Sequence, residues 1–217
     1  MAVDNIAEKI IKMSKNTRVV RIGHPARILD SVLPKCLDQL FKDYKTRFEN
    51  LQDEQTEKDE KIKKMTDEEI KQEILDTSQI IFSTNVSSGG KYINKLVRNA
   101  SRKAFDLVII DECAQATEPI CWIPLKHAEK VVLAGDHMQL APLIKSKLAA
   151  DQGLSDTMFE QLIRNRPEQV KMLRIQHRMN EKIMFWSSEC MYKGELVAAP
   201  DVADQLLGNR YRTPRDR

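Results

Sequence analysis

Two adjacent carboxylates, Asp111 and Glu112, follow directly after a short apolar run at residues 107–110. A continuous run of this kind is typical of a strand buried on both faces of a parallel sheet. Ligands of open α/β sheets bind just beyond the carboxyl ends of the strands, where this pair would lie. In phosphoryl-transfer ATPases, one such carboxylate holds Mg²⁺, usually through water, and the other orients or deprotonates the attacking water. A strand that ends in a solvated acidic turn would give the same pattern.

A second strand of the same design ends twenty-odd residues later. The β-branched run at residues 131–134 leads into Gly135 and Asp136, and Gln139 follows three residues after Asp136. Glycine suits a tight turn where the backbone passes close to a ligand. The amide of Gln139 can donate and accept, which suits contact with a γ-phosphate or with its attacking water. Alternatively, Gln139 only caps the turn.

Gln176 and Arg178 form a third candidate group. They follow a predicted strand at residues 170–175. An arginine that reaches a γ-phosphate across a domain cleft stabilises charge in the transition state. Most arginines are only surface charges, so Arg178 carries weight only in combination with the other two stretches.

Together, the three stretches resemble motifs II, III and IV of superfamily 1 helicases, in the family's order and spacing. They read Asp-Glu-Cys-Ala-Gln-Ala at 111–116, Gly-Asp-His-Met-Gln-Leu-Ala-Pro at 135–142 and Gln-His-Arg-Met at 176–179. The chain is most similar to the group of the nonsense-mediated-decay helicase, senataxin and the immunoglobulin-mu-binding helicase. Two positions depart from the family pattern, because His177 replaces a tyrosine and Ala141 replaces the first of two prolines.

This resemblance implies an ATP-dependent helicase that hydrolyses ATP while it translocates on single-stranded DNA or RNA, 5′-to-3′ in the resembling proteins. ATP and Mg²⁺ would be its cofactors. The residues implied at the nucleotide are Asp111 (Mg²⁺, through water), Glu112, Gln139 and Arg178 (catalysis), and Asp136 and Gln176 (nucleotide binding). A hydroxyl-rich loop after a strand predicted at 79–84 could hold a nucleic-acid phosphate, although an ordinary loop would look similar. The resemblance favours backbone contacts by Thr84, Ser87 and Ser88.

The phosphate-binding loop of such ATPases, Gly-x-x-x-x-Gly-Lys-Ser/Thr, is not found in these 217 residues. At the single Gly-Lys pair, Gly90-Lys91, the first glycine falls on Asn85 and the hydroxyl position falls on Tyr92. We therefore expect an internal slice of a helicase, which alone would lack catalysis. In the family, the strand that leads into this loop is central in the sheet. Without that strand, apolar faces and backbone groups of the neighbouring strands would be left unpaired.

Two other functions account for part of the pattern. The first is a non-catalytic fragment that binds nucleic acid or a protein partner. The second is a two-carboxylate metal nuclease that uses Asp111, Glu112 and Asp136, but it leaves Gln139 and Arg178 without a role.

The expected fold is α/β, with an incomplete RecA-like (P-loop NTPase) parallel sheet, helices on both faces and an inserted helical hairpin. The expected parts are a partial first RecA-like domain (1–30 and 77–170), the hairpin (31–76), the start of a second RecA-like domain (171–207) and a disordered tail (208–217).

Local signals support several of these elements. Apolar residues at alternating four- and three-residue steps from Leu33 to Leu51 predict a packed helix, and Thr66 with Glu69 predicts a capping box for the next one. Asp4 is a candidate N-cap of the first helix. Ser155 is predicted to cap a helix that begins near residue 156.

Composition gives weaker limits. Lys and Arg number 35 against 32 Asp and Glu, so a net charge of +3 does not by itself indicate nucleic-acid binding, although a local groove can be basic. The 4 cysteines and 4 histidines show no metal-ligand spacing. No apolar run is long enough to span a bilayer. We expect a nuclear or cytoplasmic protein, monomeric, with no membrane partner.

Overall fold

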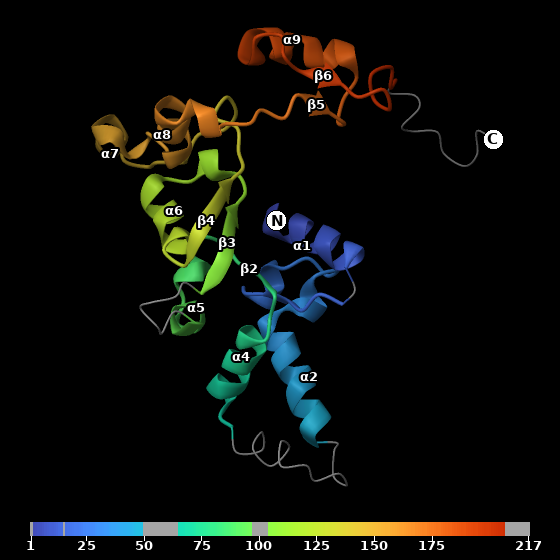
Figure 1. Ribbon diagram of the computed structural model, residues 1–217, viewed down its shortest axis with the longest axis vertical. Helices are drawn as coiled ribbons and strands as arrows, with labels where there is room; N and C mark the ends of the chain where they lie inside the picture. Colours follow the sequence, from blue (N-terminus) through green and yellow to red (C-terminus); the bar gives the residue numbers. More distant parts are fainter. Residues whose placement is uncertain (1, 15, 50–64, 97–103, 207–217) are drawn as a thin grey trace, which may run out of the picture. The chain divides into compact units, whose positions relative to one another are not determined.

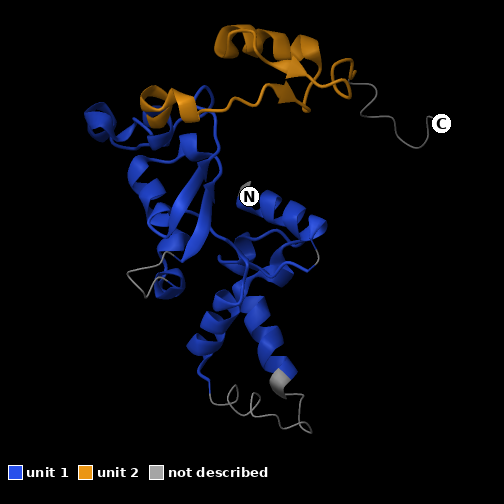
Figure 2. Cartoon of the chain, in the orientation of Figure 1, with its two compact units in different colours: residues 1–161 blue, residues 162–217 orange. Residues whose placement is uncertain are grey.

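The computed structural model describes residues 2–14, 16–49, 65–96 and 104–206 (Figure 1). The chain divides into two compact units, residues 1–161 and residues 162–217 (Figure 2). The predicted tail and the turn of the predicted hairpin lie outside the described residues.

The described elements alternate between helices and short strands. The helices are α1 (Ala2–Met13), α2 (Leu37–Glu49), α4 (Asp67–Asp76), α5 (Lys91–Leu96), α6 (Glu118–Leu125), α7 (Lys147–Ala149), α8 (Met158–Asn165) and α9 (Glu181–Tyr192). The strands are β1 (Val19–Arg21), β2 (Ile80–Phe82), β3 (Phe105–Ile110), β4 (Ala128–Leu133), β5 (Ile175–Gln176) and β6 (Val197–Ala198).

All the described strands pair in parallel. β1 pairs with β2, β3 with β4, and β5 with β6, as three separate two-stranded sheets. Parallel strands need a crossover between them, and helices α4, α6 and α9 lie in these connections. A mixed α/β architecture with parallel strand pairs is thereby confirmed, and it is consistent with a P-loop NTPase-like fold.

The prediction that the 107–110 strand is buried on both faces is wrong. Ile110 packs in a core with Cys113, Cys121 and Met158. On the opposite face of β3, Leu107 and Ile109 are 46% and 63% exposed. Side chains alternate between the two faces of a strand, and within the described residues only the first face has such a core.

The N-terminal helix is fixed by a buried ion pair rather than by the predicted cap. Asp4 lies inside α1 and is fully buried. Its Oδ1 accepts a hydrogen bond of 2.6 Å from Nε of Arg21, which is only 4% exposed. The capping prediction for Asp4 is therefore wrong, because its carboxylate neutralises an arginine of β1.

Helices α2 and α4 pack together as predicted for the two arms of the hairpin (Figure 1). The capping box of α4 is confirmed. The Thr66 amide donates to Glu69 Oε2 at 2.8 Å, and the Glu69 amide donates to Thr66 Oγ1 at 3.3 Å. An ion pair of 2.9 Å between Lys71 and Asp38 links α4 to α2.

The predicted start of the following helix is wrong by a few residues. Thr157, not Ser155, caps α8, since its Oγ1 accepts a hydrogen bond of 3.2 Å from the Glu160 amide. Glu160 Oε2 in turn accepts a hydrogen bond of 3.2 Å from the Thr157 amide, which completes a capping box. The Ser155 hydroxyl instead donates to the carbonyl of Ala150 at 3.0 Å.

The predicted strand at 170–175 is mostly absent. Of these six residues, only Ile175 joins a sheet. It forms strand β5 together with Gln176, and the two residues pair with the two residues of β6. Across the described parts of the chain, no helix combines the length and apolarity that a membrane span requires.

Candidate nucleotide and nucleic-acid sites

The structure brings the first two candidate stretches to one sheet edge. Ile110 of β3 lies beside Leu133 of β4 in the parallel register. Beyond these residues, the Ala134 amide donates to the Ile110 carbonyl and the Cys113 amide donates to the Ala134 carbonyl, both at 2.8 Å. The two strands therefore end side by side, and the acidic turns that follow them start next to each other.

Gly135 is required by this close approach. A Cβ atom at Gly135 would lie 3.0 Å from the Ala114 nitrogen and 3.1 Å from the Cys113 nitrogen. Both neighbours are backbone atoms, which cannot rotate away as the end of a flexible side chain can. The close approach at Gly135 is therefore made by the neighbouring turn, and the predicted approach of its backbone to a ligand stays a prediction.

Glu112 adopts a left-handed backbone conformation, with φ of 53°. This region is uncommon for residues with a side chain and marks a tightly constrained turn. The turn buries Cys113 and leaves Asp111 and Glu112 exposed. Glu112 Oε2 accepts a hydrogen bond of 2.9 Å from Gln115 Nε2, so its carboxylate is oriented by its own turn.

Asp136 and Gln139 are joined within the second turn. Asp136 Oδ1 accepts from the Met138 amide at 3.0 Å, and Oδ2 accepts from Gln139 Nε2 at 2.6 Å. Gln139 is exposed, and this bond leaves its carbonyl oxygen as the acceptor toward solvent. The geometry fits the turn-capping interpretation of Gln139 and does not remove its use as an acceptor.

The donor set at this edge fits Mg²⁺. In the described part of the chain, no hydrogen bond or ion pair involves the Asp111 carboxylate, which is exposed beside Glu112. Carboxylate oxygens are the ligands that Mg²⁺ prefers. The described residues contain no cluster of three or more His, Cys, Asp or Glu able to hold a metal. A Mg²⁺ ion here would be held by Asp111 through water, with phosphate and water as its ligands.

Gln176 and Arg178 both lie in the second unit. Gln176 Oε1 accepts from the amides of Arg178 and Met179, at 2.7 Å and 2.9 Å. Gln176 Nε2 donates to the Met179 carbonyl at 2.7 Å. The side-chain amide of Gln176 therefore stabilises the turn that follows it, and Arg178 lies exposed in this turn.

His177 is paired across the same unit with Asp201. Its Nδ1 lies 3.2 Å and 3.3 Å from the two carboxylate oxygens of Asp201. This contact could not be predicted from the sequence, because the two residues are far apart in the chain and no local pattern connects them. By contrast, the contact between Gln115 and Glu112 could have been predicted from the sequence, because side chains three residues apart in a turn lie close together.

The candidate nucleic-acid loop is held together by hydrogen bonds among its own residues. Thr84 Oγ1 donates to Ser87 Oγ at 2.8 Å and accepts from the Ser87 amide at 3.2 Å. Ser88 is buried, and its hydroxyl donates to the Asn85 carbonyl at 2.5 Å. The loop therefore presents Thr84 and, in part, Ser87 to solvent, whereas Ser88 supports it from inside.

The lysine of the Gly-Lys pair after this loop forms an ion pair within the structure. Lys91 is ion-paired with Glu68 of α4, and Lys95 Nζ lies 3.3 Å from the same carboxylate. These lysines lower the pKa of Glu68 through their hydrogen bonds and charges. Lys91 therefore links α5 to the hairpin.

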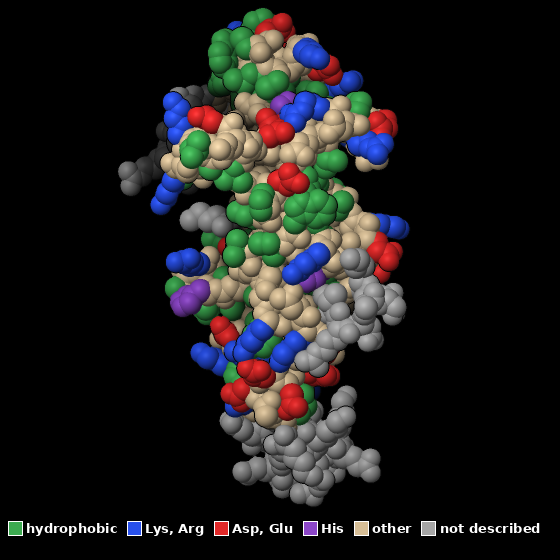
Figure 3. Space-filling view, turned by 90° about the vertical axis from the view of Figure 1, so that its left-hand side faces the viewer, with side chains coloured by type: hydrophobic (Ala, Val, Ile, Leu, Met, Phe, Trp, Pro, Cys, Tyr) green, Lys and Arg blue, Asp and Glu red, His purple; other side chains and the backbone are tan. Residues whose placement is uncertain are grey.

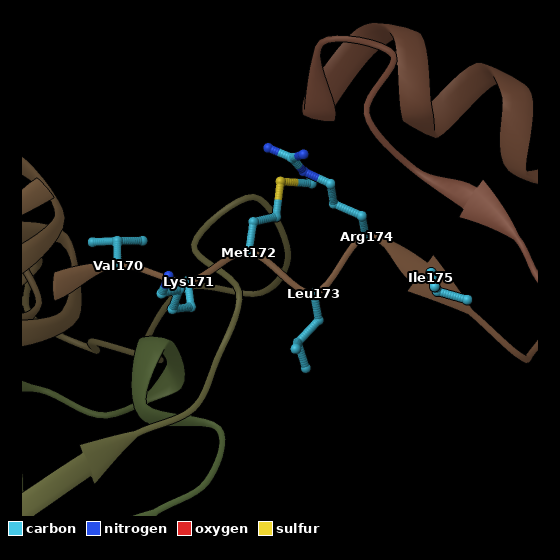
Figure 4. Close-up of a pocket in the computed structure, with 6 residues that line it drawn as sticks. All are labelled: Val170, Lys171, Met172, Leu173, Arg174 and Ile175. Carbon is cyan, nitrogen blue, oxygen red and sulfur yellow. The ribbon is translucent and has the colours of Figure 1, made fainter. Parts of the chain in front are cut away.

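A hollow of about 660 Å³ in the second unit is lined by the consecutive residues 170–175. In Figure 4 the labelled side chains point to different sides of this extended stretch rather than toward a common centre. Leu173 is 89% exposed. The hollow has none of the converging polar groups of a binding site.

Comparison with known proteins places these motifs in a family. Two protein-family models match, each described as an AAA domain, over residues 41–147 and 154–216. The chain is 36% identical to DNA-binding protein SMUBP-2 of Mesocricetus auratus, over 95% of this chain and 23% of that protein. It is 36% identical to DNA polymerase alpha-associated DNA helicase A of Saccharomyces cerevisiae, over 95% of this chain and 35% of that protein.

A third relative is the uncharacterized ATP-dependent helicase MJ0104 of Methanocaldococcus jannaschii, at 30% identity over 95% of this chain and 38% of that protein. The chain spans between 23% and 38% of the length of these relatives. The three motifs lie within the matched region in the order expected from the resemblance. The chain belongs to the superfamily 1 helicases, in the group of the immunoglobulin-mu-binding helicase and senataxin.

Proposed function

We propose that this chain is part of an ATP-dependent helicase that hydrolyses ATP while it moves 5′-to-3′ along single-stranded DNA or RNA. The observation that carries the proposal is the meeting of two turns, Asp111–Glu112 and Asp136–Gln139, at the ends of the paired strands β3 and β4. The yeast and archaeal relatives are named as helicases, which supports the proposal. Such a role would place the protein in the nucleus or the cytoplasm.

We also propose how the parts correspond to helicase domains. Residues 1–30 and 77–170 would form an incomplete first RecA-like domain, with the hairpin of residues 31–76 inserted into it. Residues 171–207 would begin a second one. The parallel pairing in all three sheets and the packing of α2 on α4 support this division. We also propose that helices cover both faces of the sheet. The apolar side chains of Leu107 and Ile109, which are exposed on one face of β3, would then be covered.

In this function the Glu112 carboxylate would accept a proton from the attacking water. Its left-handed turn and the hydrogen bond from Gln115 hold it at the open sheet edge. Asp111 would hold Mg²⁺, and a bound Mg²⁺ would neutralise charge on the phosphate oxygens. Gln139 would offer its carbonyl oxygen to the water, and Arg178 would stabilise charge on the γ-phosphate. Asp136 and Gln176 would contact the nucleotide, and their hydrogen bonds would also position Gln139 and Arg178.

On the nucleic-acid side, Thr84 and Ser87 would contact phosphates of the bound strand, because their hydroxyls lie on the loop that follows β2. Hydroxyl contacts of this type hold a strand without reading its sequence. Ser88 would act by supporting the loop, since its hydroxyl is buried against the Asn85 carbonyl.

A second candidate is nucleic-acid binding without catalysis. The Gly90-Lys91 pair favours it, because Lys91 is ion-paired with Glu68 instead of belonging to a phosphate-binding loop. Binding would then depend on salt, with a log-log slope of roughly −0.7 for each single-strand phosphate contacted.

The test is ATP turnover, with and without single-stranded DNA or RNA, in the native polypeptide that carries this chain. Glu112→Gln should reduce turnover by a factor on the order of 10² or more and leave ATP binding intact. Glu129→Gln, which changes an exposed carboxylate of β4, is the matched control. Unchanged turnover in Glu112→Gln would remove Glu112 as the base. Salt-dependent strand binding without any turnover would favour the second candidate.

A further inference from the structure

A cavity of about 440 Å³ lies on the first unit, apart from the strand ends. It is lined by Glu118, Pro119 and Trp122 of α6 and by Gly153, Leu154 and Asp156 before α8. Figure 3 views the side of the molecule that carries α6, where hydrophobic side chains gather over the middle of the surface. No step of the proposed function uses this cavity.

Trp122 supplies a fixed and open aromatic surface. Its side chain is 56% exposed, which is high for a residue of this size. The indole Nε1 donates a hydrogen bond of 3.0 Å to Glu118 Oε1, one helical turn earlier. This bond holds the ring by its polar edge, and the exposed part of the ring is apolar surface that a ligand can cover.

Glu118 is held on both sides and keeps acceptor capacity. Oε1 accepts from Trp122, and Oε2 accepts from Gln161 Nε2 at 2.9 Å. A carboxylate has about four lone-pair positions, so further acceptor capacity remains. The hydrogen bonds from Trp122 and Gln161 lower the pKa of Glu118, while the nearby charge of Asp156 raises it.

The cavity therefore combines an aromatic face with two acidic side chains, Glu118 and Asp156. None of its six lining residues is basic. A flat cation matches this set, because it can stack on Trp122 and donate two parallel hydrogen bonds to a carboxylate. Guanidinium has both properties, whereas an ammonium group offers no planar pair of donors. A nucleic-acid phosphate is excluded by the same negative charge.

The size of the cavity admits an arginine side chain as part of a protein segment. About 440 Å³ lies within the range of sites that enclose drug-sized ligands, so the cavity has room for a side chain and part of its backbone. Pro119 and Leu154 supply apolar walls for the residues that flank the cation. We propose that this cavity docks an arginine side chain of a protein partner, with the guanidinium stacked on Trp122 and paired with Glu118.

The test uses tryptophan fluorescence of the full chain. Because the chain has 2 tryptophans, Trp186→Phe leaves Trp122 as the only indole. The probes are the peptide acetyl-Gly-Arg-Gly-amide, its citrulline counterpart and free arginine. We expect saturable quenching by the arginine peptide, and at least about tenfold weaker binding of the neutral citrulline peptide, which lacks the charge. Equal binding of both peptides would overturn the proposal.

Substitutions of the cavity residues test which side chains contact the arginine peptide. Glu118→Gln keeps the size and the acceptor for Trp122 and should weaken the arginine peptide about tenfold, whereas Glu129→Gln, outside the cavity, should leave its affinity unchanged. Trp122→Ala, followed by calorimetry, should abolish binding, and circular dichroism should show native helix content. Retained binding in either cavity variant refutes the assigned contacts. Free arginine that binds as tightly as the peptide would indicate a small-molecule site and would refute docking of a protein.

Discussion

Gln115 Nε2 donates a hydrogen bond of 2.9 Å to Glu112 Oε2 across a turn in which Glu112 has a φ of 53°. This bond closes a three-residue helix, Cys113–Gln115, of which the first two residues are buried. The exposed carboxylate is therefore oriented by a turn anchored in the core. In a site where Glu112 activates water, Gln115 would be a positioning residue that touches no substrate.

We predict that Gln115→Ala lowers ATP turnover of the native polypeptide by about ten- to a hundredfold, because a small displacement of a catalytic group is costly. The affinity for ATP should stay the same, since the side chain of Gln115 acts through its hydrogen bond to Glu112. Steady-state kinetics should show the loss in kcat rather than in KM. Gln169→Ala, which removes an exposed amide elsewhere, is the control. Equal loss in both variants would contradict a positioning role.

The strand ends could be predicted from sequence because they depend on local signals. An apolar run followed by Asp111 and Glu112, and a β-branched run followed by Gly135, each identify a strand and its end. The parallel register of β3 and β4 then brings the two turns together. The capping box of Thr66 and Glu69 was equally readable, because all of its contacts lie within four residues.

Contacts between distant residues could not be predicted in this way. Asp4 reads as a helix cap, but its partner Arg21 lies 17 residues away and buries it. The exposed face of β3 was also missed, because an apolar run says nothing about which neighbours cover it. At the start of α8, the Ser155 signal competed with a reciprocal pair, Thr157 and Glu160, whose two hydrogen bonds define the cap.

Gly135→Ala should destabilise the chain by about 1–3 kcal/mol, because the added methyl group would lie 3.0 Å from the Ala114 nitrogen and must push the two turns apart. Urea unfolding followed by circular dichroism measures the change. Gly153→Ala is the comparison, since Gly153 has a φ of 102° and open space around its Cβ position. It should cost only about 1 kcal/mol of backbone strain. A smaller loss at Gly135 than at Gly153 would show that the turns can separate freely.

Arg21→Met should destabilise the chain by roughly 3–5 kcal/mol, because it leaves the buried Asp4 carboxylate without its ion-pair partner. The double variant Asp4→Leu with Arg21→Met should recover much of this loss, since two apolar side chains leave no uncompensated charge. Urea unfolding of the three proteins measures the effect. As a surface comparison, Lys12→Met breaks an ion pair with Glu8 and should leave the unfolding midpoint unchanged. Equal stability of the single and double variants would refute this account of the pair.

The hairpin cap should make stability depend on pH through Glu69. Its pKa is lowered from the usual 4.5 by hydrogen bonds from the backbone and the side chain of Thr66. A carboxyl whose folded-state pKa is lowered binds a proton more readily when unfolded, so its stabilisation is present above pH 4.5 and is lost as the pH falls through the folded-state pKa. Urea unfolding of the wild type and of Glu69→Gln should therefore differ at pH 7, and the difference should shrink as the pH falls below 4.5. A difference that stays constant from pH 7 to pH 3 would mean that the charge of Glu69 contributes nothing to the cap.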